Sequence, residues 1–198
     1  MSARLHMAVP PLILASASPR RAELLRQVNL DFKIVPSDAP ELAHEHLSPL
    51  ELCQLNAHRK ARAVAKRFPD ALVLGADTLV FLDEEILGKP ASLAEAHSMM
   101  ERLQGRTHQV VTGADLIHLR AHREHIFAVS SQVTFRPLTA ADIRAYFAKV
   151  NPLDKAGAYA IQEHGDMIVE KVSGSYSNVV GLPVDKLLEE LALWKRAR

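Results

Sequence analysis

Residues 12–21 read LILASASPRR, and this segment indicates where a buried strand gives way to a helix. Residues 12–15 form a short, wholly apolar run, which is typical of a strand buried on both faces. Ser18 suits a helix N-cap because its hydroxyl can accept a hydrogen bond from a free backbone N–H. Pro19 suits the first helical position because its φ is already close to the helical value. We therefore predict a strand, a tight turn and a helix that continues to about Val28.

The rest of the chain alternates between strand-like and helix-like segments. A second short strand is predicted around residues 32–34, and a capping box at residues 48–51 opens a long helix to about residue 68. A buried strand over residues 71–76 is expected to end at Asp77 and Thr78. The remaining predicted elements are a turn at 83–84 between short strands, a helix over 92–105, an antiparallel hairpin of 109–119 and 125–135, a helix over 139–148, a strand near 167–172 and a C-terminal helix over 183–194. Buried strands combined with a hairpin predict an α/β domain around a mixed sheet.

Length and composition limit the class of protein. With 198 residues, 48% of them hydrophobic, the chain is expected to form a single domain over residues 1–198, with residues 1–10 as a short N-terminal extension. A formal net charge of +1 argues against a nucleic-acid partner. Cys53 is the only cysteine, so no disulfide can form within the chain, and a reducing, cytoplasmic location is favoured. Two prolines interrupt the apolar N-terminal run, and no stretch approaches the ~18 apolar residues of a membrane span, so we expect neither a signal peptide nor a membrane partner.

The turn after the first strand is a candidate phosphate site. A helix N-terminus presents free backbone N–H groups and a partial positive charge, both of which attract phosphate. Ser16 and Ser18 add hydroxyl groups, and Arg20 and Arg21 add guanidinium groups that can bind phosphate through two hydrogen bonds. A capped helix followed by two solvated arginines is the alternative interpretation, so this motif alone favours phosphate only slightly.

An aspartate and three lysines could supply the chemistry. Asp77 follows a buried strand, and a carboxylate there can hold Mg²⁺ or orient a water molecule; the alternative is that it caps the following turn. Lys60, Lys89 and Lys155 could stabilise the negative charge of a triphosphate and of a departing pyrophosphate. Each lysine by itself is more often a surface charge, so the interpretation depends on all of them lying near Asp77.

Other features give weaker signals. The run His44-Glu45-His46 has metal-binding side chains, but a third ligand is not evident nearby. Cys53 is expected to be a small core residue rather than a nucleophile. The sequence has no Walker A motif and no G-x-G-x-x-G motif, so neither P-loop nor dinucleotide chemistry is indicated.

Taken together, these segments resemble the Maf family of nucleotide pyrophosphatases. The resemblance rests on motifs that occur in family order and span residues 11–190. These motifs are LASASPRR at 14–21, GADT at 75–78, GKP at 88–90, GRTH at 105–108, DKAGAY at 154–159 with Gln162, and GLP at 181–183. The fold that the resemblance implies is a two-lobed α/β structure around a mixed, strongly twisted sheet, with a central nucleotide cleft.

The resemblance also implies roles for single residues. Asp77 matches the family's catalytic carboxylate, which accepts a proton from water, and Lys60, Lys89 and Lys155 match basic phosphate contacts. Arg20, Thr78 and Gln162 match the pattern of the branch that acts on dTTP and UTP, and are the implied specificity positions. A divalent cation (Mg²⁺, Mn²⁺ or Co²⁺) is implied as cofactor, bound by Asp77 and by an acidic residue after the second strand. Glu41 has the matching spacing for that residue, and Asp38 is the alternative.

The resemblance therefore implies an enzyme that splits dTTP or UTP into a monophosphate and pyrophosphate, commonly as a homodimer. Two alternatives remain open at this point. The first is a pyrophosphatase for modified purine triphosphates, which would share the metal chemistry. The second is a non-catalytic, nucleotide-binding regulator of cell division, because the family has also been associated with inhibition of septum formation.

Overall fold

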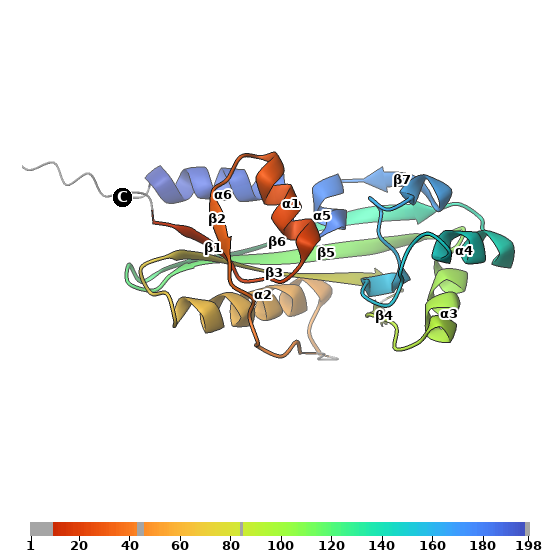
Figure 1. The fold of residues 1–198 in the computed structure, drawn as a ribbon, viewed down its shortest axis with the longest axis horizontal. Helices are drawn as coiled ribbons and strands as arrows, with labels where there is room; N and C mark the ends of the chain where they lie inside the picture. Colours follow the sequence, from red (N-terminus) through yellow and green to blue (C-terminus); the bar gives the residue numbers. More distant parts are fainter. Residues whose placement is uncertain (1–9, 43–45, 84, 197–198) are drawn as a thin grey trace, which may run out of the picture.

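A twisted mixed sheet runs along the length of the molecule, with helices on both of its faces (Figure 1). The computed structural model describes residues 10–42, 46–83 and 85–196. Within these residues seven strands form one sheet in the order β2-β1-β3-β5-β6-β7, and β4 also pairs with β3. The strands are β1 Leu12–Leu14, β2 Phe32–Ile34, β3 Leu72–Leu82, β4 Glu85–Leu87, β5 Thr107–His118, β6 Arg123–Phe135 and β7 Val169–Ser173. The predicted mixed sheet is confirmed: β1 is parallel to β2 and β3, and β5 and β6 form the expected antiparallel hairpin.

The helices largely agree with the prediction. They are α1 Pro19–Gln27, α2 Pro49–Ala65, α3 Leu93–Leu103, α4 Ala140–Phe147, α5 Tyr176–Val180 and α6 Val184–Arg196, with short 3-10 helices η1 Ala156–Ala158 and η2 Gly165–Met167. The Ser18 and Ser48 hydroxyls cap α1 and α2 as expected. The sequence analysis did not predict α5, η1 or η2, which are too short for a helical period to be visible. None of the helices in the described ranges has the length and apolar character needed to cross a membrane.

Strand β3 differs from the prediction in a way that defines the site. We expected it to end at Asp77 and Thr78; this is wrong, because β3 continues to Leu82. It continues because β5 pairs with it from Val73 to Phe81 and satisfies its backbone groups over that length. On the opposite edge, β1 pairs only with residues 72–74 and β4 only with residues 80–82. Residues 75–79 of β3 therefore form an open edge between β1 and β4.

The two larger of the four hydrophobic clusters formed by the described residues lie on either side of this open edge. One core packs α1 and α6 against β1 and β3, around Leu14, Leu25 and Trp194. The other packs α3 and α4 near β4, around Met100, Phe135 and other buried residues. The two cores correspond to the two lobes that the family resemblance implied.

Helix α2 covers the opposite face of the sheet from α1 and α6 (Figure 1). It lies unusually close to the strands because glycine occupies the contact positions. A Cβ atom at Gly75 would overlap the backbone of Ala57, and one at Gly113 would overlap the backbone of Cys53. The close contact brings the polar residues of α2 within hydrogen-bonding distance of acidic side chains on β3 and β5.

Candidate active site

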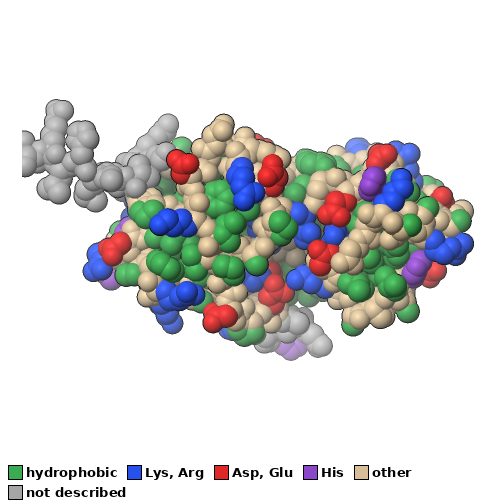
Figure 2. Space-filling model, in the orientation of Figure 1, with side chains coloured by type: hydrophobic (Ala, Val, Ile, Leu, Met, Phe, Trp, Pro, Cys, Tyr) green, Lys and Arg blue, Asp and Glu red, His purple; other side chains and the backbone are tan. Residues whose placement is uncertain are grey.

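A cleft of about 430 Å³ opens at the unpaired edge of β3, between the two halves of the molecule. Figure 2 shows Lys, Arg, Asp and Glu side chains gathered around this hollow. The structure brings all eleven candidate site residues to its walls: Ser16, Ser18, Arg20, Arg21, Glu41, Lys60, Asp77, Thr78, Lys89, Lys155 and Gln162. Five lining residues are basic and three are acidic, so the cleft has a formal charge of 5 − 3 = +2, whereas the whole chain has +1. Such a concentration of positive charge attracts anions.

Asp77 lies at the centre of a hydrogen-bond network on the α2 face of β3. Its side chain is only 5% exposed. Its Oδ2 atom accepts a hydrogen bond of 3.1 Å from Asn56 Nδ2, and its Oδ1 atom accepts one of 2.6 Å from Lys60 Nζ. The ammonium and the amide together give each carboxylate oxygen of this buried aspartate a hydrogen-bond donor.

Glu41 meets the same ammonium from the loop after β2. Lys60 Nζ donates to Glu41 Oε1 at 2.6 Å, so the two carboxylates face one positive charge. Partial burial would raise the pKa of Glu41, but the hydrogen bond and charge of Lys60, with the charges of Lys89 and Arg21, outweigh burial and lower its pKa overall. Asp38 is exposed and does not line the cleft, so Glu41 is the acid that the loop presents there.

The two carboxylates fit a hard divalent cation. Glu41 Oε1 and Asp77 Oδ1 converge on the position of the Lys60 ammonium, and carboxylate oxygens are the ligands that Mg²⁺ and Mn²⁺ prefer. Glu41 is 55% exposed, which leaves room for a cation and its water molecules on the cleft side. Of the weaker metal motif at residues 44–46, His44 and Glu45 lie outside the described residues.

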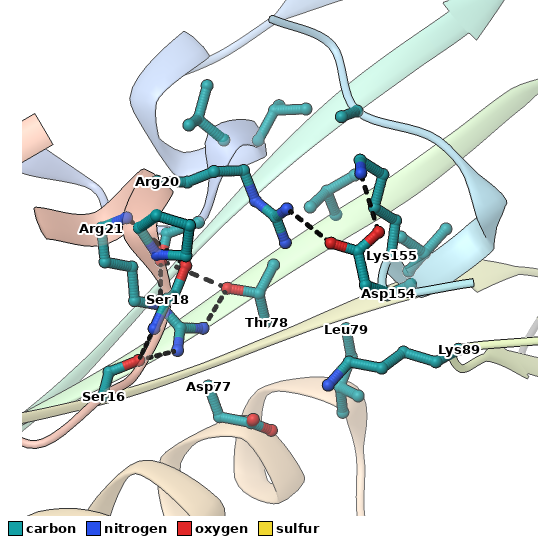
Figure 3. A pocket seen from close by; sticks show the side chains of 18 of the residues that line it. Ser16, Ser18, Arg20, Arg21, Asp77, Thr78, Leu79, Lys89, Asp154 and Lys155 are labelled. Atoms are coloured by element: carbon teal, nitrogen blue, oxygen red, sulfur yellow. Dashed lines mark hydrogen bonds and ion pairs between the residues drawn. The ribbon is translucent and has the colours of Figure 1, made fainter. Parts of the chain in front are cut away.

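Arg21 lies on the other face of β3 and connects three parts of the chain. Its Nε donates to Gly181 O at 2.8 Å, one terminal nitrogen donates to Ser16 Oγ at 3.1 Å, and the other donates to Thr78 Oγ1 at 3.0 Å. These bonds use three of the five N–H groups of the guanidinium. Figure 3 shows those to Ser16 and Thr78. Burial is the main cause that lowers the pKa of Arg21. Arg21 thus holds the start of α1 against β3 and is not simply a solvated phosphate ligand.

Thr78 is held in the same network. Besides the bond from Arg21, its hydroxyl lies 2.9 Å from Thr112 Oγ1 and 3.3 Å from Gly181 O. Neighbouring residues of a strand point to opposite faces, so Asp77 and Thr78 reach the cleft from the two faces of β3. Both can line one cavity because the edge of β3 between them is open.

Arg20 and Lys155 approach each other across the cleft through an acid that the sequence analysis did not single out. Asp154 accepts a hydrogen bond of 2.8 Å from Lys155 Nζ and lies 3.8 Å from a terminal nitrogen of Arg20 (Figure 3). Lys155 is 5% exposed and also donates to Asn151 O at 2.9 Å. Partial burial would raise the pKa of Asp154, but Lys155 and Arg20 lower it overall. An anionic ligand would therefore compete with Asp154 for two cations.

The remaining two candidates lie on loops that follow β4 and η1. Lys89 follows β4, and Figure 3 shows its amine extending toward Asp77. Gln162 lies on the exposed rim of the cleft, after η1. The backbone N–H of Gly157 donates to Gly88 O at 3.0 Å and so joins the two loops that carry Lys89 and Lys155.

Asn56 is a second residue that the sequence analysis missed. It is only 2% exposed, and besides contacting Asp77 it bonds both backbone groups of Leu42, the neighbour of Glu41. A polar residue on the buried face of a helix was the only signal in the sequence that could have drawn attention to it.

Comparison with known protein sequences identifies the family of this chain. The family model described as Maf-like protein matches residues 11–194, nearly the whole chain. The chain belongs to the Maf family. Its relatives in this family include proteins named dTTP/UTP pyrophosphatase. The protein from Akkermansia muciniphila is 48% identical over 181 residues (91% of this chain and 95% of that protein). The protein from Moorella thermoacetica is 49% identical over 183 residues (92% and 94%), and that from Bacillus velezensis is 46% identical over 181 residues (91% and 94%).

Proposed function

We propose that this Maf-family chain hydrolyses dTTP and UTP to the monophosphate and pyrophosphate with the help of a divalent cation. The observation that carries the proposal is Asp77, a carboxylate 5% exposed in a cleft with a formal charge of +2. The names of the relatives support the reaction and the pyrimidine substrates. A carboxylate that can take a proton from water favours catalysis over a purely regulatory binding role.

In this mechanism the chain supplies a base, charge and orientation. Asp77 accepts a proton from a water molecule whose oxygen attacks the α-phosphorus, and the bond from that phosphorus to the bridging oxygen breaks. Lys60, Lys89 and Lys155 stabilise the negative charge that passes to the departing pyrophosphate. Asn56 keeps the Asp77 carboxylate oriented through its 3.1 Å hydrogen bond. A Mg²⁺, Mn²⁺ or Co²⁺ ion held by Glu41 and Asp77 would add Lewis-acid polarisation of the phosphate.

Substrate contacts divide between the two lobes. Ser16, Ser18 and the start of α1 offer hydroxyl and N–H groups to phosphate, and Arg21 fixes their position. We assign discrimination among bases to Arg20, Thr78 and Gln162, all of which line the cleft. Because the Thr78 hydroxyl is already bonded within the protein, its part in specificity is to shape the cleft wall. We also propose a cytoplasmic location and a homodimer, the latter testable by light scattering on the purified chain.

The direct test is pyrophosphate release from canonical and modified nucleoside triphosphates with Mg²⁺, Mn²⁺ or Co²⁺ and an EDTA control. Cation-dependent release that is fastest with dTTP and UTP supports the proposal. Preference for a modified purine would support the proposed reaction but refute the specificity roles of Arg20, Thr78 and Gln162. Nucleotide binding without release would favour the regulatory alternative.

Asp77→Asn keeps the shape of the side chain but removes the base, so we expect turnover to fall by about 10²–10⁴-fold. Asp185→Asn, at an exposed acid in the first turn of α6, is the matched control and should retain wild-type turnover. Circular dichroism checks that both variants fold. Near-normal turnover of a folded Asp77→Asn protein would remove Asp77 as the base.

A further inference from the structure

Three metal-ligating side chains converge outside the cleft, from α2, β5 and β6. His58 Nδ1 lies 3.0 Å from Asp115 Oδ2 and 2.6 Å from Glu124 Oε1. The three ligand atoms all lie within 4.8 Å of one another. None of these residues, here called the His58 cluster, lines the cleft.

The register of the sheet explains why they meet. Asp115 on β5 is paired with Gly75 on β3, one of the two glycines against which α2 packs. Glu124 on β6 is paired with Ile117, two residues along β5 from Asp115. Since paired residues and residues two apart share a face of the sheet, Asp115 and Glu124 both face α2, where His58 meets them.

Hydrogen bonds within the protein leave this cluster incompletely satisfied. The Asp115 side chain is 0% exposed, and its Oδ1 atom has no hydrogen-bond partner among the described residues. The two carboxylates contact the same imidazole nitrogen, which carries at most one proton. Burial, and after it the charge of Glu124, raises the pKa of Asp115 to about 8, with Arg62 acting in the opposite direction. A buried, unpaired carboxylate oxygen is costly unless a cation or a proton compensates it.

We propose that His58, Asp115 and Glu124 bind a divalent transition-metal ion, separate from the cation of the cleft. One imidazole and two carboxylates are a ligand set that suits Zn²⁺, Mn²⁺ or Co²⁺. Ligand atoms on a tetrahedral ion with ~2.05 Å bonds lie about 3.3 Å apart, so the contact from Nδ1 to Asp115 needs to lengthen by about 0.3 Å and that to Glu124 by about 0.7 Å. His58 is 26% and Glu124 37% exposed, which gives the ion access from solvent and room for a water ligand.

The ion would link α2 to β5 and β6 at the middle of the helix. His58 lies between Asn56 and Lys60, the two α2 residues that hold Asp77. Its role is therefore to fix the position of α2, and with it the network around Asp77, while taking no part in contacts with the substrate.

The test is the number of Co²⁺ ions bound per chain, measured by equilibrium dialysis on the full-length, chelator-treated protein, together with the Co²⁺-induced change in Tm. We expect Asp115→Asn and His58→Gln each to bind one ion fewer than wild type and to lose a Tm increase of several degrees. His125→Gln, at an exposed histidine of β6, is the matched control and should behave as wild type. Asp77→Asn should retain the ion of the His58 cluster.

Equal Co²⁺ binding by wild type, Asp115→Asn and His58→Gln would overturn the proposal, as would an ion lost only in Asp77→Asn. Circular dichroism shows whether each variant folds, and His58→Gln, at a half-buried position, provides a second route if Asp115→Asn does not. Lack of pyrophosphate release by wild type would refute the proposed function but leave the difference in Co²⁺ binding unaffected, so the two failures are distinguishable.

Discussion

Asn56 provides a sharp test of how the cleft is held together, because its side chain contacts both Asp77 and the residue next to Glu41. Its amide exchanges two hydrogen bonds with Leu42, of 2.8 and 3.1 Å, and gives a third of 3.1 Å to Asp77. Asn56→Ala removes two neutral hydrogen bonds worth ~1 kcal/mol each and one to a charged group worth ~1.5–3 kcal/mol. Because water can form some of these hydrogen bonds in the variant, we expect the free energy of unfolding to fall by about 2–4 kcal/mol.

The functional consequence follows from the same three bonds. Leu42 adjoins Glu41, so the loop that presents this acid loses its attachment to α2, while Asp77 loses one of its two partners. We therefore expect a higher Mg²⁺ concentration for half-maximal pyrophosphate release, in addition to lower turnover. A purely structural role for Asn56 would lower stability without changing the Mg²⁺ dependence.

Urea unfolding and Mg²⁺ titrations of pyrophosphate release measure the two effects. Gln54→Ala, at a half-buried polar position of the same helix, is the matched control and should change stability by less than about 1 kcal/mol. If Asn56→Ala unfolds within 1 kcal/mol of wild type and has an unchanged Mg²⁺ titration, the network does not position these acids, and the reasoning is refuted.

Three further predictions concern single side chains. Asp154→Asn should lower the KM for UTP by up to about fivefold at low salt, because Asp154, 58% exposed, no longer competes with phosphate for two cations; KM measured at two ionic strengths checks this. Burial, helped by the charge of Asp77, raises the pKa of Cys53 to about 12, so the thiol should not react with a maleimide at pH 8 until urea unfolds the chain. Burial lowers the pKa of His108 to about 4, so this residue is neutral when folded and gains a proton near pH 6.5 only when unfolded. The contribution of His108 to stability is thus present above pH 6.5, and roughly 3 kcal/mol of it is lost as the pH falls toward 4. Urea unfolding at several pH values should show that the free energy of unfolding of His108→Gln depends less steeply on pH than that of wild type.

Local sequence signals predicted most of the fold. The caps at Ser18 and Ser48 and the hairpin of β5 and β6 are encoded by neighbouring residues, and all were recognised. The continuation of β3 beyond Asp77 was missed because polar residues inside a strand resemble a turn when the pairing with β5 is unknown. The five-residue helix α5 was missed because it spans little more than one turn.

The candidate site was predictable as a set of residues but not as an arrangement. The sequence analysis named eleven of the residues that the structure brings to the cleft, but not Asp154. The contacts of Asn56 with Leu42, of Arg21 with Gly181 and of Asp154 with Arg20 join residues far apart in the sequence, and no periodicity reports them. The His58 cluster was missed for the same reason, since its three members lie on three separate elements.

The pairing of β3 with β5 gives a physical reason why two acidic clusters lie under one helix. Gly75 is paired with Asp115, and Asp77 is paired with Gly113, so each buried carboxylate stands opposite a glycine on the neighbouring strand. The glycines let the backbone of α2 come close enough for the side chains of Asn56 and His58 to reach the two acids. A helix held farther away by two Cβ atoms would leave both carboxylates buried without partners, at a cost of several kcal/mol. The glycines therefore support the role of Asp77 indirectly, by setting the distance between α2 and the sheet. The same short distance brings His58 to Asp115.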